Sequence, residues 1–328
     1  MESITKNRQP EPVLRAMVKR AYGHELVPAP GPGWVSELGH GWFNVAYRVR
    51  LADGADVVLK IAPPPAVEVL SYEGGAMAVE LAALRLIREQ TSVPVPDVHY
   101  ADTSRDLCDA DYFFMPFIDG DNLGIIGERL SPAERDAYHE ALGAANRELN
   151  SVRGAAFGPL TGPGDRSWRT VFTGMLEGVL GDGVRRQVDL GCDYDSVRSV
   201  IAANAASLDE VTEPAFVEWD LWDNNVMVRA GKIIAVIDHE RAFYGDPLIE
   251  GGFTATQLPA FGDPAAFLRG YGRGGLTGAE HARRRLYTLY LTLIMVIESV
   301  YREAGDSQYD WARGRLAEAL ALFAGRAR

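Results

Sequence analysis

A strand-rich segment, residues 216–238, interrupts a part of the chain whose other patterns are helical. Two apolar runs, Val226 to Val228 and Ile233 to Ile237, are separated by a short turn that contains Gly231. Two apolar runs around a glycine turn predict a β-hairpin. A hairpin brings the chain back to where it started, so the residues just outside its two strands are expected to lie together.

Three polar residues flank this predicted hairpin. Asn225 precedes its first strand, Asp238 follows its second, and Asp220 lies on the short loop that leads into it. Carboxylate and amide oxygens are suitable ligands for Mg²⁺, and a further carboxylate can orient an attacking hydroxyl or accept its proton. The five-residue offset between Asp220 and Asn225 matches the catalytic Asp and metal-binding Asn of the protein-kinase template. The pattern predicts a site for phosphoryl transfer.

The predicted secondary structure of the rest of the chain changes near residue 119. Before it, short strands alternate with turns around one helix, Glu73 to Glu89, whose apolar residues recur at helical spacing. After it, helical patterns dominate, and Ser131 to Glu134 has capping-box spacing. We therefore expect a bilobal α+β fold like that of protein kinases. Its first lobe, residues 1–118, is expected to be a small antiparallel sheet with one main helix that binds nucleotide, and its second lobe, residues 119–328, to be mostly helical and to carry catalysis and substrate binding.

The predicted first lobe contains further candidates. Lys60 stands in the apolar strand Val57 to Ile61, where a buried ammonium group needs a negative partner such as phosphate. An acid on the following helix is expected to hold it, and the sequence leaves both Glu73 and Glu80 open. The turn around Gly39 and Gly41 could cover phosphates with backbone amides, although glycines are common in such turns.

Composition narrows the range of partners. The formal net charge of −12 argues against nucleic acid and is compatible with a cationic small molecule. The most apolar stretch, Leu286 to Val300, contains Glu298 and is shorter than the roughly 20 residues of a membrane span. Two unpaired-looking cysteines and a polar N-terminus are typical of a cytoplasmic protein. We expect no nucleic-acid or membrane partner.

In their order and spacing these pieces resemble the aminoglycoside-phosphotransferase family, kinase relatives that phosphorylate small molecules. The resemblance covers about Val35 to Pro247. It includes a run from Gly39 to Val49 with Asn44 within it, Val58-Leu59-Lys60, and Glu80 before Val93-Pro94-Val95-Pro96. It continues through Phe114 to Gly120, Asp220-Leu221-x-x-x-Asn225, Ile237-Asp238-x-Glu240 and Gly245-Asp246-Pro247.

The resemblance implies roles for individual residues. Gly39, Gly41 and Asn44 would belong to the loop over the phosphates of ATP, and Lys60 and Glu80 would pair there. The backbone of Met115 to Phe117 would hold adenine. Asp220 would be the catalytic aspartate, Asn225 and Asp238 would bind Mg²⁺, and Asp246 would brace the larger lobe.

One residue departs from the family pattern. The family usually has His two residues before the catalytic Asp, whereas this chain has Glu218. Because that His mainly supports the loop, we expect altered bracing and not a loss of activity. Trp219 and Trp222, on either side of Asp220, are candidates either for core packing or for substrate contact.

The expected reaction is transfer of the γ-phosphoryl group of ATP to a hydroxyl of a small, cationic molecule such as an aminoglycoside-like antibiotic. A choline, homoserine or sugar kinase would use the same residues, and a nucleotide-binding pseudokinase is a further alternative. The acids that could bind substrate ammonium groups are Asp263, Glu280, Glu298 and Glu303.

Overall fold

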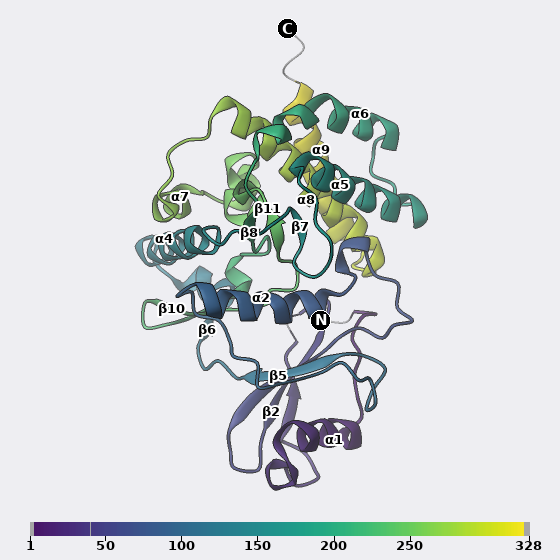
Figure 1. Cartoon of the computed structure of the whole chain (residues 1–328), viewed down its shortest axis with the longest axis vertical. Coiled ribbons are helices and arrows are strands. Elements are labelled where there is room, and N and C mark those ends of the chain that lie inside the picture. The colour runs from purple at the N-terminus through teal and green to yellow at the C-terminus, as the bar shows by residue number, and fades with distance from the viewer. Residues whose placement is uncertain (1–2, 40, 325–328) are drawn as a thin grey trace. The chain divides into compact units, whose positions relative to one another are not determined.

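The computed structural model describes residues 3–39 and 41–324. By its contacts the chain forms two compact units. Unit 1 comprises Met1–Val69 and Pro96–Asp119, and unit 2 comprises Leu70–Val95 and Gly120–Arg328. Figure 1 shows the helices and strands of both units, many of them labelled.

Unit 1 is built on a five-stranded antiparallel sheet with the order β1-β2-β3-β5-β4. Helix α1 packs on it through Leu14, Met17 and Val18, which share a buried cluster with Leu59 and Phe114 of the sheet. The elements of this unit are α1 (Glu11–Tyr22), a 3₁₀ turn (His24–Leu26), β1 (Val35–Glu37), β2 (Val45–Arg50), β3 (Asp56–Ile61), β4 (Tyr100–Asp102) and β5 (Tyr112–Pro116).

Unit 2 is mostly helical. Its largest core joins α5 to α8, where the rings of Trp168 and Phe172 meet Tyr287 and Tyr290. The helices are α2 (Ala76–Gln90), α3 (Leu123–Ile126), α4 (Pro132–Leu149), α5 (Trp168–Arg185), α6 (Tyr194–Asn204), α7 (Ala265–Tyr271), α8 (Gly278–Tyr301) and α9 (Asp306–Ala324). Short 3₁₀ turns occupy Ser71–Glu73, Gly127–Arg129, Ala205–Glu210, Asp223–Asn225, Pro247–Ile249, Gly251–Thr256 and Pro259–Phe261.

Two three-stranded sheets complete unit 2, with the orders β10-β9-β6 and β7-β11-β8. The first contains the predicted hairpin, and the second leads into the loop that carries Asp220. Their strands are β6 (Asp121–Asn122), β7 (Gly158–Pro159), β8 (Ala215–Val217), β9 (Val226–Arg229), β10 (Lys232–Val236) and β11 (Phe243–Gly245).

Helix α2 differs from expectation in two ways. It begins at Ala76 and not at Glu73, because Gly75 stands before it in a left-handed conformation with φ +75°. By its contacts it also belongs to unit 2 and not to the small lobe. The physical reason is its apolar face: Ala83 and Ile87 lie in one buried cluster with Leu142 of α4.

The mixed α+β architecture, with an antiparallel sheet in one unit and mostly helices in the other, is as predicted. The capping box at α4 is also confirmed, since Ser131 and Glu134 exchange hydrogen bonds between side chain and backbone. The domain boundary after residue 118 stays a prediction. Within residues 3–39 and 41–324, no helix combines the length and the apolar character needed to cross a membrane.

Candidate active site

The hairpin of β9 and β10 closes through a two-residue turn. Ala230 and Gly231 both have positive φ, 48° and 78°, which is the geometry of a type I′ turn. At the open end Val226 pairs with Val236, and the main-chain N–H of Ile237 donates to the oxygen of Asn225 at 2.9 Å. The predicted hairpin is therefore present, and it brings Asn225 next to the segment that begins with Asp238.

Asp220 is bound to Asn225 by two hydrogen bonds. The Nδ2 of Asn225 donates to the main-chain oxygen of Asp220 at 2.8 Å and to its Oδ2 at 3.2 Å. Because the amide nitrogen is turned toward Asp220, the amide oxygen is the atom that remains to bind a cation. Burial raises the pKa of Asp220, and so do the charges of Asp238 and other acids, whereas Arg241 lowers it.

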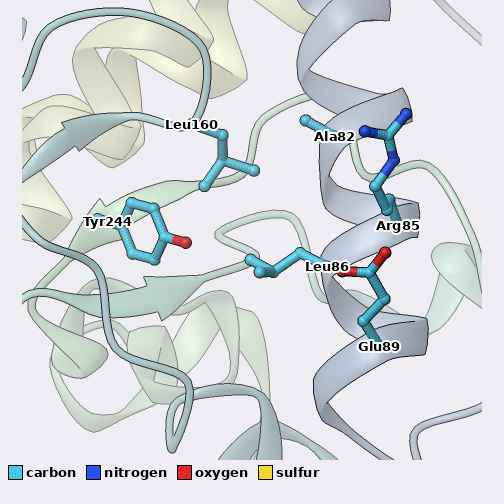
Figure 2. A pocket seen from close by; sticks show the side chains of 6 residues that line it. All are labelled: Ala82, Arg85, Leu86, Glu89, Leu160 and Tyr244. Atoms are coloured by element: carbon cyan, nitrogen blue, oxygen red, sulfur yellow. The ribbon is translucent and has the colours of Figure 1, made fainter.

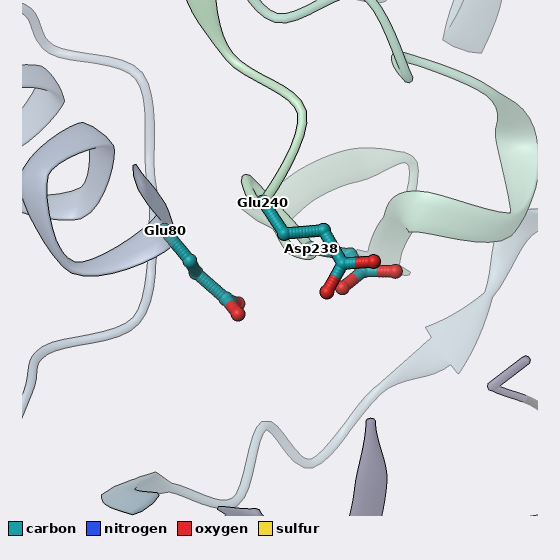
Figure 3. A group of neighbouring side chains, drawn as sticks. All are labelled: Glu80, Asp238 and Glu240. Carbon is teal, nitrogen blue, oxygen red and sulfur yellow. The ribbon is translucent and has the colours of Figure 1, made fainter. Parts of the chain in front are cut away.

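Asp238 lies in a group of three carboxylates in unit 2, shown in Figure 3. Oxygen atoms of Glu80, Asp238 and Glu240 all lie within 4.8 Å of one another. Glu80 comes from α2 and is 1% exposed, and the other two flank His239 just after β10. A set of clustered carboxylate oxygens has the chemistry that Mg²⁺ requires, so these residues fit the expected metal.

The alternative of Glu73 as the acid for Lys60 is not favoured. The side chain of Glu73 is 4% exposed and forms an ion pair with Arg302, and its Oε2 accepts the N–H of Leu70 at 2.8 Å. Glu73 therefore already has a buried positive partner within unit 2. The pairing of Lys60 with Glu80 stays a prediction.

In unit 1, Lys60 lies on the central strand β3 and is 7% exposed. Its neighbours across the sheet are Ala46 on β2 and Phe113 on β5, and its Nζ lies 6.0 Å from the centroid of the Phe113 ring. The loop predicted to cover the nucleotide phosphates joins β1 to β2. Gly39, Gly41 and Asn44 all lie on it, while His40 is outside the described residues.

The resemblance predicts that Met115 to Phe117 hold adenine. Met115 is buried on β5 opposite Val58, and Phe117 follows the strand, with its N–H donating to the oxygen of Asp56 at 3.2 Å. The guanidinium of Arg48 stands 4.2 Å from the centroid of the Phe117 ring. The segment is thus fixed at the end of β5, and its role toward adenine stays a prediction.

Lys6, in the segment before α1, contacts the loop between β1 and β2, and the sequence did not predict this contact. Lys6 is 8% exposed, and its Nζ donates to the main-chain oxygen of Asn44 at 2.9 Å. The neighbouring Thr5 donates its hydroxyl to the oxygen of Trp42 at 3.0 Å. The segment before α1 therefore supports the loop that carries Gly41 and Asn44. Because Lys6 and Asn44 are 38 residues apart, no local sequence pattern predicts their contact.

The loop before Asp220 is held by another missed residue, Glu250. Its buried carboxyl accepts the N–H groups of Glu218 at 2.6 Å and Trp219 at 3.1 Å. Burial and the nearby charge of Glu218 raise the pKa of Glu250 to about 8. Trp219 needs this support because its φ of +63° is costly for a bulky residue.

Of the two tryptophans left open, Trp219 is 5% exposed and packs against Tyr72 and Tyr290. It is a core residue. Trp222 is partly exposed, and its ring centroid lies 6.0 Å from that of Phe261.

Arg241 lies with its Nε 3.9 Å from Oδ2 of Asp220. It also forms an ion pair with Glu298 on α8, at 3.2 Å. Two of the four acids expected to attract a cationic substrate already pair with arginines: Glu298 with Arg241, and Glu280 with Arg273.

Asp246 is connected to α8 by two hydrogen bonds. It accepts from Arg283 at 2.8 Å and from the hydroxyl of Tyr287 at 2.7 Å.

A shallow hollow of about 210 Å³ opens along α2 (Figure 2). On α2 it is lined by Ala82, Arg85, Leu86 and Glu89, and the rest of its wall is Leu160 and Tyr244. At 100° per residue these positions lie on the face of α2 opposite Glu80. The hollow is therefore separate from the carboxylate group.

Comparison with known proteins identifies the class. Residues 34–287 match the model of the phosphotransferase enzyme family. Since the match includes more than half of the sequence, the chain belongs to this family. As a member of this family, the chain is a phosphotransferase.

Solved structures share the fold at low sequence identity. A thermostable mutant of aminoglycoside phosphotransferase APH(4)-Ia, in ternary complex with AMP-PNP and hygromycin B, is 19% identical, covers 95% of this chain and 99% of its own, and has a TM-score of 0.66. An inferred fructosamine-3-kinase from Thermobifida fusca YX-ER1 is 21% identical, covers 94% and 98%, and has a TM-score of 0.63.

A curated relative is similar over a shorter region. The subtelomeric hrmA-associated cluster protein of Aspergillus fumigatus is 26% identical over 148 residues, which are 45% of this chain and 28% of the fungal protein. This chain thus matches less than a third of that relative's length.

Proposed function

We propose that this chain transfers the γ-phosphoryl group of ATP to a hydroxyl group of a small molecule and uses Mg²⁺ to do so. The observation that carries the proposal is the open end of the hairpin, where the side chain of Asn225 is hydrogen bonded to Asp220 and its main-chain oxygen accepts from the N–H of Ile237, the residue before Asp238. These contacts join the amide of Asn225 to the carboxylate of Asp220 and to the segment that leads into Asp238, an arrangement that supports phosphoryl transfer with a metal.

The roles follow unit by unit. In unit 2, Asp238 and Asn225 would bind the metal, which when bound neutralises phosphate charge and aligns the triphosphate. Asp220 would receive the acceptor. In unit 1, Lys60 and the loop with Gly39, Gly41 and Asn44 would bind the nucleotide phosphates, and Met115 and Phe117 the adenine.

Asp220 has two tasks in the proposed reaction. Its carboxylate is oriented by Asn225 and can accept a hydrogen bond from the substrate hydroxyl. As the hydroxyl oxygen bonds to the γ-phosphorus, the bond to the bridging oxygen of ADP breaks, and the proton passes to Asp220. The raised pKa of Asp220 favours this last step, because a more basic carboxylate holds the proton better.

Two observations support a cationic acceptor. The net charge of −12 favours a cationic acceptor, and hygromycin B occupies the ternary complex of APH(4)-Ia. Arg241, whose Nε lies 3.9 Å from Oδ2 of Asp220, is positive like the proposed acceptor, and Glu298 partly neutralises it. We propose an aminoglycoside-like antibiotic as the acceptor class.

A panel of sugars with different charges tests this assignment. Glucosamine, glucose and glucuronate share the ring hydroxyls at C3 and C4 and carry a positive charge, no charge and a negative charge, and aminoglycosides, macrolides and amino alcohols extend the panel. The proposal predicts acceptor-dependent ADP release, with cationic compounds turned over fastest. Turnover of neutral sugars with no response to cations would refute the cationic acceptor while leaving the kinase assignment intact.

A further inference from the structure

The residue that departs from the family pattern, Glu218, has a buried partner. Glu218 follows β8 directly and is 1% exposed, and His239 is fully buried. The Nδ1 of His239 lies 2.8 Å from Oε1 of Glu218. Two ionisable side chains that are buried this completely rarely remain unpaired, because each would otherwise lose its solvation without compensation.

The imidazole of His239 is fixed from its other side as well. Its Nε2 lies 3.0 Å from the main-chain oxygen of Val236, the last residue of β10. A carbonyl oxygen can only accept, so Nε2 donates the hydrogen bond and Nδ1 faces Glu218. The ring is thereby oriented by the end of the hairpin and by the loop after β8 together.

The pair joins the two segments that carry the proposed chemistry. Glu218 is two residues before Asp220, and His239 stands between Asp238 and Glu240. Both segments contain a non-glycine residue in the left-handed region, Trp219 at φ +63° and Asp238 at φ +71°. Such conformations cost about 1–3 kcal/mol each and persist only where surrounding contacts hold them.

We propose that Glu218 and His239 are positioning residues that lock the Asp220 loop to the metal-binding segment at Asp238. The ion pair would take over, from within this chain, the bracing that the missing family histidine provides elsewhere. This inference rests on the proposed function, since it assigns the pair a task in presenting Asp238 to Mg²⁺.

The test uses binding and does not depend on the unknown acceptor. Glu218→Gln keeps the shape of the side chain and removes its charge, and His239→Gln keeps a donor for Val236 but removes the atom facing Glu218. Calorimetry measures the affinity for AMP-PNP across a Mg²⁺ titration and in EDTA. Each variant should need roughly 10–100-fold more Mg²⁺ for half-maximal binding, as expected for groups that orient metal ligands. Binding without metal should stay within about twofold of wild type.

The double variant tests whether the two residues act together. Its increase in the Mg²⁺ needed for half-maximal binding should be much smaller than the product of the two single-variant increases, because residues in contact couple.

A second buried ion pair serves as the matched control. Arg283 and Asp246 lie 2.8 Å apart and are 9% and 5% exposed. Arg283→Gln should lower the melting temperature and leave the Mg²⁺ requirement at the wild-type value. If Glu218→Gln fails to fold, Glu218→Asp keeps the charge at a shorter reach and should show a smaller shift in the same direction.

The outcomes separate the two proposals. A wild-type Mg²⁺ requirement in folded Glu218 and His239 variants, even with a lowered melting temperature, would show that the pair only stabilises the fold and would overturn the inference. Wild-type protein that binds AMP-PNP equally with and without Mg²⁺ would instead contradict the proposed function itself.

Discussion

Arg302→Gln should destabilise the protein strongly, by an amount that depends on pH. Arg302 is 1% exposed and pairs with Glu73, which is 4% exposed, so the substitution leaves a buried carboxylate without its positive partner. Breaking a buried pair from one side costs about 3–5 kcal/mol. Because Glu73 can stay protonated once Arg302 is gone, the pH-dependent part of this loss at pH 8 is limited to about 1.4 kcal/mol, which corresponds to the one pH unit above the wild-type pKa of about 7.

The pH dependence follows from Glu73. Its pKa is raised from the ordinary 4.5 to about 7, chiefly by burial, while Arg302 lowers it. The folded state therefore binds more protons than the unfolded state between these values, and stability falls as pH rises through that window. At about 1.4 kcal/mol per pH unit, Glu73 alone removes about 3 kcal/mol from the wild type. Without Arg302 the pKa rises further, so the variant loses more than the wild type toward alkaline pH.

Urea denaturation followed by tryptophan fluorescence at pH 5 and pH 8 measures both effects. The deficit of Arg302→Gln relative to wild type should be larger at pH 8 than at pH 5, where Glu73 is largely neutral, by up to about 1.4 kcal/mol. Arg198→Gln, at the exposed pair with Glu177, is the control and should cost less than about 1 kcal/mol at either pH. A deficit for Arg302→Gln below 1 kcal/mol at pH 8, or an equal deficit at both pH values, would refute the reasoning.

Three further substitutions have defined outcomes. Asp238→Ala should abolish Mg²⁺-dependent binding of AMP-PNP, since it removes a proposed metal ligand; a calorimetric titration with the metal present that still matched wild type would contradict this. Glu250→Ala leaves the N–H groups of Glu218 and Trp219 without their acceptor, at about 1–3 kcal/mol each, so both the unfolding free energy and turnover should fall. Lys6→Met removes the bond to the oxygen of Asn44 and should weaken AMP-PNP binding in unit 1 with little change in the Mg²⁺ requirement, and unchanged nucleotide affinity would exclude Lys6 from the loop's function.

The parts of the fold that the sequence predicted are those with local signals. The hairpin of β9 and β10 follows from two apolar runs and a glycine turn, and the start of α4 follows from the Ser131 capping box. The convergence of Asn225 with the Asp238 segment needed no long-range assumption, because a hairpin enforces it.

What escaped prediction depends on contacts between distant segments. Glu250 supports the loop before Asp220 from about 30 residues away, and Lys6 reaches Asn44 across 38 residues. Neither leaves a periodic or motif-like trace. The grouping of α2 with unit 2 is similar, because only the packed cluster shows that Ala83 and Ile87 bury against α4.

The packing of Glu218 was foreseen only in part. The sequence showed that the family histidine is missing, but not that His239 compensates from the neighbouring segment. Because the two residues are 21 positions apart, their pairing emerges only once the hairpin has folded between them.

Phosphoryl transfer itself is the most direct test of the central claim. Wild-type protein and Asp220→Asn would be incubated with ATP, Mg²⁺ and the acceptor panel, and phosphorylated product would be measured by mass spectrometry. We predict a product one phosphoryl group heavier than its acceptor for the wild type, and turnover lower by roughly 10²–10⁴-fold for Asp220→Asn with AMP-PNP binding retained. Equal turnover by the two proteins on an accepted substrate would contradict the role of Asp220 and with it the account of the site.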